Sequence, residues 1–373
     1  MKAIFYLAII VTFFGCESKK NEKVAAVVSD EKEIKYATGF TIKQFDNYRL
    51  ITLKDTWKGE TSNFRYVLYE NEKPTGVEHA VFIKTPIKSI ACMSLTHIAY
   101  LEKLGLEKSI VALSGCQYVS SPQIKALIDA KLIREIGMQQ HLNYELLVDK
   151  SPDILMGYGI DESSNSSINK LQSLGVKVVL NAEYMETHPL GKAEWIKFIA
   201  AFYNEGEKAE FLFNKIEKNY LNLLAQTKNL TKPTVFVGMP WNGAWYVPGG
   251  KSFQAQLFKD AGAEYLWKDN KEKSSLVKSK EVIIDVALEA DYWLNQNSYQ
   301  SIAELIGFDG KFKSFNAIKK QHVYNNDNRT NTFSGNDYWE SGVVNPDLVL
   351  KDLIEIFHPE VLDDELYYYR KLK

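Results

Sequence analysis

The chain has 373 residues, of which 45% are hydrophobic and 25% are charged. This length is compatible with two domains, and the composition is typical of a globular protein with ample material for its cores. The 45 Lys and Arg residues nearly balance the 47 Asp and Glu residues, which leaves a net charge of -2 without a basic block and excludes nucleic acid as the expected partner.

The N-terminus has the features of an export signal. Lys2 precedes an apolar run over 3–14, and Gly15-Cys16 leads into a polar stretch. The run is too short to span a bilayer, and no later segment is long and apolar enough to do so. We predict a signal peptide over 1–15, acylation of Cys16, and a periplasmic protein that is lipid-anchored to a bacterial membrane. An ordinary signal peptide and a short membrane helix are the alternatives.

The segment after the signal changes from charged to β-rich. Residues 16–38 are charged and small, which predicts a flexible tether. Three short β-rich runs, at 40–45, 48–53 and 64–69, are bounded by turn residues. They predict a small antiparallel β unit over 39–78.

From residue 87 the pattern alternates between strands and helices. Predicted strands lie at 87–92, 110–113, 136, 153–156 and 177–180, and predicted helices lie at 96–104, 122–130, 144–148 and 165–174. Alternating units of this spacing imply a parallel sheet covered by helices. We assign 79–190 to an N-terminal lobe.

A long helix then separates two such regions. Apolar residues recur at helical spacing over 207–228, within a helical linker assigned to 191–231. The strand–helix pattern restarts afterwards, with strands at 234–238, 245–247, 292–294 and 323–324 and helices at 252–260, 281–288, 302–306 and 346–357. The predicted fold is α/β, with two lobes of parallel sheet joined by one long rigid helix, and the C-terminal lobe covers 232–373. A core helix within one large domain is the alternative.

Two cysteines follow the predicted lipidation site. Cys92 and Cys116 each come after a short apolar run that reads as a strand. A disulfide and two free thiols both fit this pattern, because the Cα separation decides between them.

Several segments together resemble the periplasmic binding proteins of iron-complex and cobalamin ABC importers, whose two lobes are bridged by a rigid helix. The segments are 89–105, 143–155, 174–178, 256–263 and 289–294. Each is short, and their order and spacing carry the resemblance over 79–358. The resemblance implies a non-enzymatic, monomeric binder that captures a ligand between its lobes and delivers it to a permease with ATPase subunits.

In such proteins the ligand lies where loops leave the carboxyl ends of the strands. Aromatic residues and an arginine near these points are the predicted ligand contacts: Tyr118, Tyr158, Trp241, Trp245, Tyr246, Trp267, Arg329 and Trp339. A wider set adds Met93, Ser94, His97, Gln117, Ser120, Asn242, Asn297 and Tyr338. Core packing is the alternative role for any of these aromatics, except that Trp241 and Trp245 flank Asn and Gly in what we predict to be a surface loop.

The resemblance also implies docking of each lobe on the permease through a carboxylate. Glu145 and Glu281 occupy the matching positions, although helix N-termini favour acids in any case. The expected ligand is a ferric siderophore, with a corrinoid or haem as alternatives, and no cofactor is expected. The family scaffold does not choose among these ligands.

Two other functions compete with this interpretation. Related folds bind bare Zn²⁺ or Mn²⁺ through several histidines, but only His97 and His141 are placed toward the cleft, and we predict no metal site. A carbohydrate-active lipoprotein is the other alternative, because Trp-rich clefts also bind sugars. The sequence has no Gly-rich phosphate loop and no nucleophile elbow.

Overall fold

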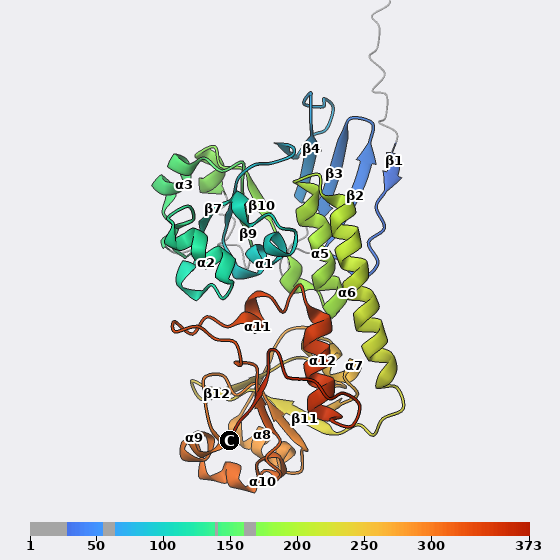
Figure 1. The fold of residues 1–373 in the computed structure, drawn as a ribbon, viewed down its shortest axis with the longest axis vertical. Helices are drawn as coiled ribbons and strands as arrows, with labels where there is room; N and C mark the ends of the chain where they lie inside the picture. The colour runs from blue at the N-terminus through green and yellow to red at the C-terminus, as the bar shows by residue number, and fades with distance from the viewer. Residues whose placement is uncertain (1–27, 55–63, 139–140, 160–168) are drawn as a thin grey trace, which may run out of the picture.

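The protein is described by a computed structural model, which covers residues 28–54, 64–138, 141–159 and 169–373. Two α/β lobes lie one above the other, and an extra β-sheet lies beside the first lobe (Figure 1). This arrangement confirms the predicted fold class. The predicted signal peptide and Cys16 lie outside the described residues.

The N-terminal sheet has five strands in the order β1-β2-β3-β4-β5. Its strands are β1 (Val28–Glu31), β2 (Phe40–Phe45), β3 (Tyr48–Leu53), β4 (Phe64–Tyr69) and β5 (Val81–Lys84). The three predicted strands pair antiparallel as expected, while β5 pairs parallel with β4 and carries the unit beyond residue 78. The predicted tether is wrong from residue 28 onward, because β1 pairs with β2.

Two buried glutamates hold the start of this unit against the first lobe. The carboxylate of Glu194 accepts backbone N–H bonds from Lys35, Tyr36 and Ala37 at 2.7–2.9 Å. Glu186 accepts those of residues 38 and 39, both at 2.9 Å. Buried carboxylates that accept several backbone N–H bonds fix a chain segment firmly, so the sheet is attached to the body of the protein.

The first lobe is built on a parallel sheet. Its strands are β6 (Ile90–Cys92), β7 (Ile110–Leu113), β8 (Arg134–Glu135), β9 (Ile154–Gly157) and β10 (Val178–Leu180), in the order β10-β9-β6-β7-β8. Helices α1 (Leu95–Lys103), α2 (Pro122–Asp129) and α3 (Tyr144–Lys150) alternate with them. Ser94, Ser121 and Asn143 cap these helices by accepting an N–H bond from the first turn.

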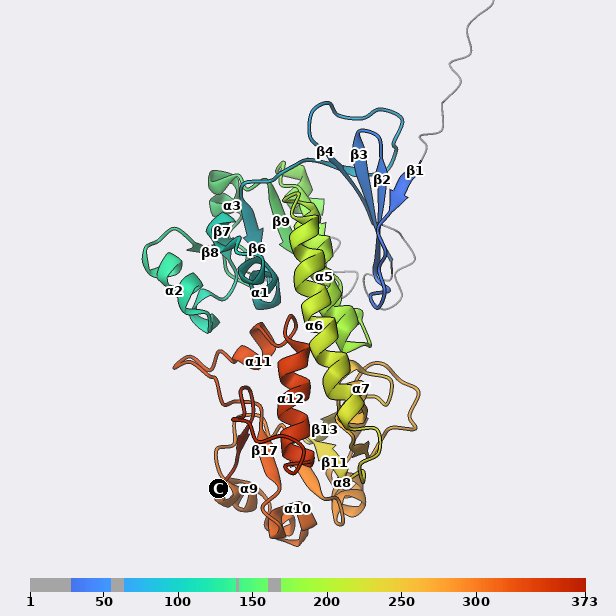
Figure 2. The same ribbon diagram turned by 45° about the vertical axis from the view of Figure 1, so that its right-hand side comes forward.

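Two helices connect the lobes. Helix α6 (Gly206–Gln226) buries Ala209, Phe213, Ile216 and Tyr220, which are residues of the predicted stripe. It runs past both lobes (Figure 2) and packs against α12 (Pro346–Phe357) of the second lobe. Helix α5 (Pro189–Ala201) precedes it and is buried on nearly every side. A helix without a polar face has no amphipathic period, and α5 was therefore not predicted as a separate element.

The second lobe contains two sheets. The larger has strands β11 (Thr234–Val237), β14 (Glu264–Tyr265), β16 (Tyr292–Leu294), β17 (Val323–Asn325) and β18 (Arg370–Lys371), in the order β14-β11-β16-β17-β18. All pairs in it are parallel except β17–β18. The smaller, antiparallel sheet has β12 (Pro240–Trp241), β13 (Ala244–Val247) and β15 (Leu276–Lys278). The remaining helices are α7 (Phe253–Asp260), α8 (Lys280–Ala287), α9 (Ile302–Phe308), α10 (Asn316–Lys319) and α11 (Asp337–Glu340).

The predicted loop between two tryptophans is a hairpin. Asn242 and Gly243 have φ values of 48° and 80°, which the turn between β12 and β13 requires. Alternation then places Trp241 outside, 63% exposed, and Trp245 inside, 0% exposed. Trp245 donates its indole N–H to the Val237 carbonyl at 3.0 Å, so its predicted ligand role is wrong.

The two described cysteines do not form a disulfide, and the described helices include no membrane span. Cys92 is buried, Cys116 is half-buried, and both thiols are free. Within the ranges that the structure covers, none of the helices combines the length and the apolar character needed to cross a membrane.

Candidate ligand-binding cavity

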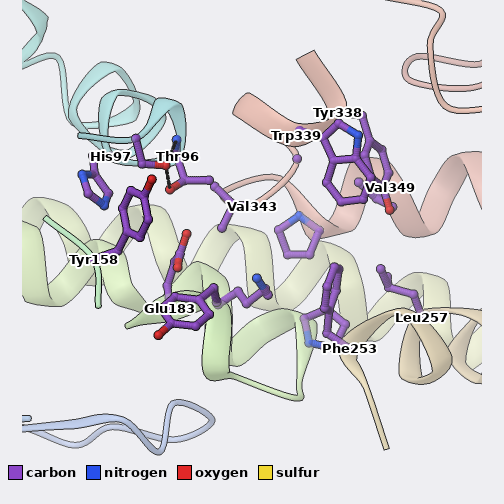
Figure 3. A pocket seen from close by; sticks show the side chains of 16 residues that line it. Thr96, His97, Tyr158, Glu183, Phe253, Leu257, Tyr338, Trp339, Val343 and Val349 are labelled. Atoms are coloured by element: carbon purple, nitrogen blue, oxygen red, sulfur yellow. Dashed lines mark hydrogen bonds between the residues drawn. The ribbon is translucent and has the colours of Figure 1, made fainter. Parts of the chain in front are cut away.

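A cavity of about 520 Å³ lies between the two lobes. The first lobe and the start of α5 line it with Ser94, Thr96, His97, Tyr158, Glu183, Tyr184, Pro189 and Lys192. The second lobe lines it with Phe253, Leu257, Tyr338, Trp339, Gly342, Val343, Pro346 and Val349 (Figure 3). This volume is in the range of small-molecule sites.

The second lobe supplies a mostly apolar wall. Phe253 and Leu257 come from α7, and Tyr338 and Trp339 come from α11. The rings of Tyr338 and Trp339 are perpendicular, with centroids 4.7 Å apart. Trp339 remains 52% exposed. Half-exposed aromatic faces in a concave site favour a ligand with a broad apolar surface.

The first lobe supplies a polar end. Ser94 caps α1, and its hydroxyl lies 2.9 Å from that of Thr96. His97 follows in the same helix and is 1% exposed, and burial lowers its pKa to about 3. Its Nδ1 has no hydrogen-bond partner in the structure. The imidazole is therefore neutral at physiological pH.

A short 3-10 helix and the start of α5 bring two opposite charges to the cavity. Glu183 is buried in the 3-10 helix Glu183–Met185, and Lys192 lies in α5. Burial lowers the pKa of Lys192, and the carboxylates of Glu183 and Glu186 oppose this shift. The Lys192 ammonium lies 4.4 Å from the centroid of the Phe253 ring.

One segment of the second lobe also contacts the first lobe. We call residues 329–345 the crossing segment; it contains α11, which faces the first lobe (Figure 1). The Asn331 amide donates to the carbonyls of Gln117 and Val119 at 3.0 and 2.9 Å. At its other end, Lys103 donates to Asn345 at 2.6 Å.

A buried carboxylate of the crossing segment makes two further contacts with the first lobe. Glu340 is 1% exposed and accepts the backbone N–H groups of Ser120 and Ser121 at 2.6 and 3.0 Å. Burial raises its pKa to about 7; the two N–H bonds oppose this shift, while the charges of Asp337 and Glu102 add to it. The crossing segment thus both lines the cavity and holds the lobes together.

Two of the eight predicted ligand contacts, Tyr158 and Trp339, line the cavity. Ser94, His97 and Tyr338 of the wider set also line it. The remaining aromatics lie elsewhere: Tyr118 is beneath the crossing segment, Trp267 packs against Tyr265, and Trp241 and Tyr246 lie on the outer face of the small sheet.

Arg329 does not line the cavity. It donates to Asp337 at 2.6 Å, and its guanidinium lies over the Tyr367 ring. Its charge therefore has partners within the protein. Lys192, whose ammonium does line the cavity, was not predicted, because a lysine in the assigned helical linker gives no signal of burial. Phe253, Leu257 and Val349 were missed for another reason: their helices were predicted, but not which face meets the cleft.

The predicted docking glutamates occupy comparable positions in the two lobes. Glu145 is exposed in the first turn of α3, and Glu281 is exposed in the first turn of α8. The structure also describes no group of three or more His, Cys, Asp or Glu side chains placed to hold a metal ion, within the residues that it covers.

Two α/β lobes bridged by a helix, with a cavity between them, define a bilobal ligand-binding protein. A family model described as periplasmic binding protein matches residues 90–330, and the chain belongs to this family. It is 28% identical to an uncharacterized lipoprotein of Methanocaldococcus jannaschii, over 96% of this chain and 92% of that protein. A second uncharacterized lipoprotein of that organism is 26% identical, over 100% and 98%.

Solved structures show the same fold. A periplasmic haem-binding protein of Pseudomonas aeruginosa matches with a TM-score of 0.59 and 15% identity, over 77% of this chain and 98% of that one. A possible iron-binding periplasmic protein of Staphylococcus epidermidis gives 0.57 and 21%, over 74% and 100%. A vitamin B12-binding protein of Vibrio cholerae gives 0.52 and 12%, over 73% and 97%.

Proposed function

We propose that the protein is the lipid-anchored substrate-binding component of an ABC importer, and that it captures an iron complex in the cavity between its lobes. The observation that carries this proposal is the cavity itself, which joins an aromatic wall from α7 and α11 to a polar end from α1. Such a site suits a chelate whose organic shell is mostly apolar. Relatives that are named lipoproteins support the anchor.

The charges at the cavity favour one type of iron complex. Among the described residues that line the cavity, Lys192 supplies an ammonium and Glu183 adds a carboxylate. A highly anionic chelate needs several cations around it, since an unpaired buried charge is costly. A ferric siderophore of low net charge, such as a trihydroxamate with one free carboxylate, fits these residues better. A corrinoid or haem is the second choice, by the same mechanism.

The two exposed glutamates support delivery of the ligand to a permease. Glu145 and Glu281 lie at the start of one helix in each lobe. We assign both to contacts with cationic residues of the permease, where exposed charges steer encounter and set orientation. The ATPase subunits then drive release of the ligand into the membrane protein.

The test is a titration of intrinsic tryptophan fluorescence with a ferric trihydroxamate, cyanocobalamin, haem and Zn²⁺. Trp339 lines the cavity and Trp241 does not, so Trp339→Phe should remove most of the ligand-dependent quenching and Trp241→Phe should keep it. Saturable one-to-one binding of the trihydroxamate supports the proposal. Binding of cobalamin or haem alone selects that alternative, and a response to Zn²⁺ alone or to nothing in the panel contradicts the proposal.

A further inference from the structure

Lys192 extends from the first lobe toward the aromatic wall of the second. Its backbone is fixed, because Tyr100 donates its hydroxyl to the Lys192 carbonyl at 2.6 Å. Its ammonium lies 4.4 Å from the centroid of the Phe253 ring, and Phe253 lines the opposite side of the cavity. The cation is therefore held between the two lobes rather than in bulk solvent.

Within the described part of the chain, no carboxylate forms a salt bridge with this cation. Among the residues that the structure describes, the salt bridges do not include Lys192, although Glu183 lines the same cavity. Burial lowers the pKa of Lys192, which shows that its environment disfavours the charge. The face of Phe253 compensates only in part, since a cation–π contact is worth about 0.5–2 kcal/mol.

A lysine in this position has a desolvation cost that an apolar residue would not have. Methionine would cover the same apolar surface without the cost of desolvating an ammonium. Arg329 is the cationic residue that the sequence predicted as a ligand contact, but its guanidinium is paired with Asp337. Of the described lining residues, Lys192 is thus the one whose positive charge is available to a ligand.

We propose that Lys192 pairs with an anionic oxygen of the ligand, so that the cavity selects molecules that combine a broad apolar body with one anionic group. The carboxylate of Glu183 lines the same space and repels a second anion. This inference rests on the proposed function in taking the cavity as the ligand site, and it narrows the class of ligand.

Two fluorescent probes with nearly the same apolar body test the charge separately from iron binding. 1-Anilinonaphthalene-8-sulfonate carries one sulfonate, and N-phenyl-1-naphthylamine carries none. Each is titrated into the chain from residue 17 onward, which keeps every described residue, and into Lys192→Met, Lys192→Arg and the control Lys218→Met. Lys218 is exposed on α6, away from the cavity.

The proposal predicts that Lys192→Met weakens sulfonate binding roughly tenfold or more, as expected for loss of a charge-assisted hydrogen bond. Binding of the neutral probe should change less than about twofold on the same argument. Lys192→Arg should retain most of the sulfonate binding, and Lys218→Met should bind both probes as the wild type does. Because Lys192→Met removes a buried charge, its melting temperature should equal or exceed that of the wild type, which excludes unfolding as the cause.

Three outcomes overturn the inference. They are equal sulfonate affinity in wild type and Lys192→Met, parallel loss of both probes in a folded Lys192→Met, and no binding of either probe to the wild type. The iron-complex titration is independent of this result. If no iron complex binds but sulfonate binding depends on Lys192, the proposed iron ligand is rejected and the pairing of Lys192 with an anion is retained. If an iron complex binds but sulfonate binding does not depend on Lys192, the pairing is rejected and the proposed iron ligand is retained.

Discussion

The carboxylate of Glu340 accepts the backbone N–H of Ser121 at 3.0 Å, and this bond joins the two lobes. Ser121 is also the N-cap of α2, so the bond attaches the crossing segment to the beginning of a first-lobe helix. Because Tyr338 and Trp339 precede Glu340 in the same segment, any movement of this attachment moves the cavity wall. The interlobe contact and the ligand site are therefore mechanically linked.

Glu340 should make stability depend on pH. Its pKa is raised from 4.5 to about 7 in the folded protein, mainly by burial. A carboxyl with a raised folded pKa stabilises the fold fully below pH 4.5, and this contribution is lost as the pH rises through 7. Between pH 4.5 and 8 the wild type should lose on the order of 3 kcal/mol of unfolding free energy relative to Glu340→Gln.

Chemical denaturation at pH 5, 6, 7 and 8 measures this difference. Glu340→Gln also loses a hydrogen bond, but that loss is a constant offset at every pH. Glu102 and Asp337 lie near Glu340 and remain in both proteins, so the difference between the two curves isolates residue 340. Parallel curves from pH 5 to 8 would contradict the predicted titration.

Gly335 allows the crossing segment to lie directly on the first lobe. A Cβ added at Gly335 would lie 2.0 Å from the Tyr118 carbonyl oxygen. Gly335→Ala should therefore destabilise the protein by about 1–3 kcal/mol, as overpacking does, and increase hydrogen exchange at the amides of 117–121. Gly307→Ala is the matched control, because nothing lies within 4 Å of a Cβ there. It should be neutral or slightly stabilising within α9.

Glu194 should be essential for holding the N-terminal sheet on the body. Three backbone N–H groups and Lys197 surround its fully buried carboxylate. Glu194→Gln presents an amide donor to these donors and removes the buried carboxylate that pairs with Lys197, which then keeps only the more exposed carboxylate of Glu210 among the described salt bridges, so we expect a loss of about 3–5 kcal/mol. Thermal unfolding and exchange of the amides of 35–37 measure it. The exposed Glu289→Gln should change neither quantity, and equal behaviour of the two variants would refute the anchoring role.

The two tryptophans of the β12–β13 hairpin should behave oppositely. Trp245 packs against Trp293 and Phe312 in the core of the second lobe. Trp245→Ala should cost about 3–5 kcal/mol, the range for large-to-small changes in a core. Trp241→Ala should stay within about 0.5 kcal/mol of the wild type, because its side chain is largely exposed. Urea denaturation of both variants gives the comparison.

Regular periodicity made most of the fold predictable. Helix α12 spans the predicted residues 346–357, and the buried stripe of α6 includes Phe213 and Ile216 as expected. Periodicity identifies elements that have one buried face. Helix α5 is buried on nearly every side, and so its sequence carries no such pattern.

The cavity was less predictable than the fold. Tyr158 was found because it follows a recognisable strand, β9. Trp245 was misassigned because the two strands of this hairpin are joined by a two-residue turn. The pairing across that turn and the alternation of side chains along each strand decide which tryptophan points inward. The crossing segment joins distant residues such as Glu340 and Ser120, and pairings of that separation leave no local signal. The position of the Lys192 side chain in the cavity also depends on contacts between residues that are distant in the sequence.

The central claim is that an iron complex binds between the lobes, and a calorimetric titration of two matched variants tests it most directly. Val343 lines the cavity, and Val148 is exposed on α3 away from it. Val343→Trp should fill the cavity and weaken binding of a ferric trihydroxamate at least about tenfold, while Val148→Trp should bind it as the wild type does. Equal affinity in all three proteins, each with an unchanged melting temperature, would place the ligand elsewhere and contradict the account.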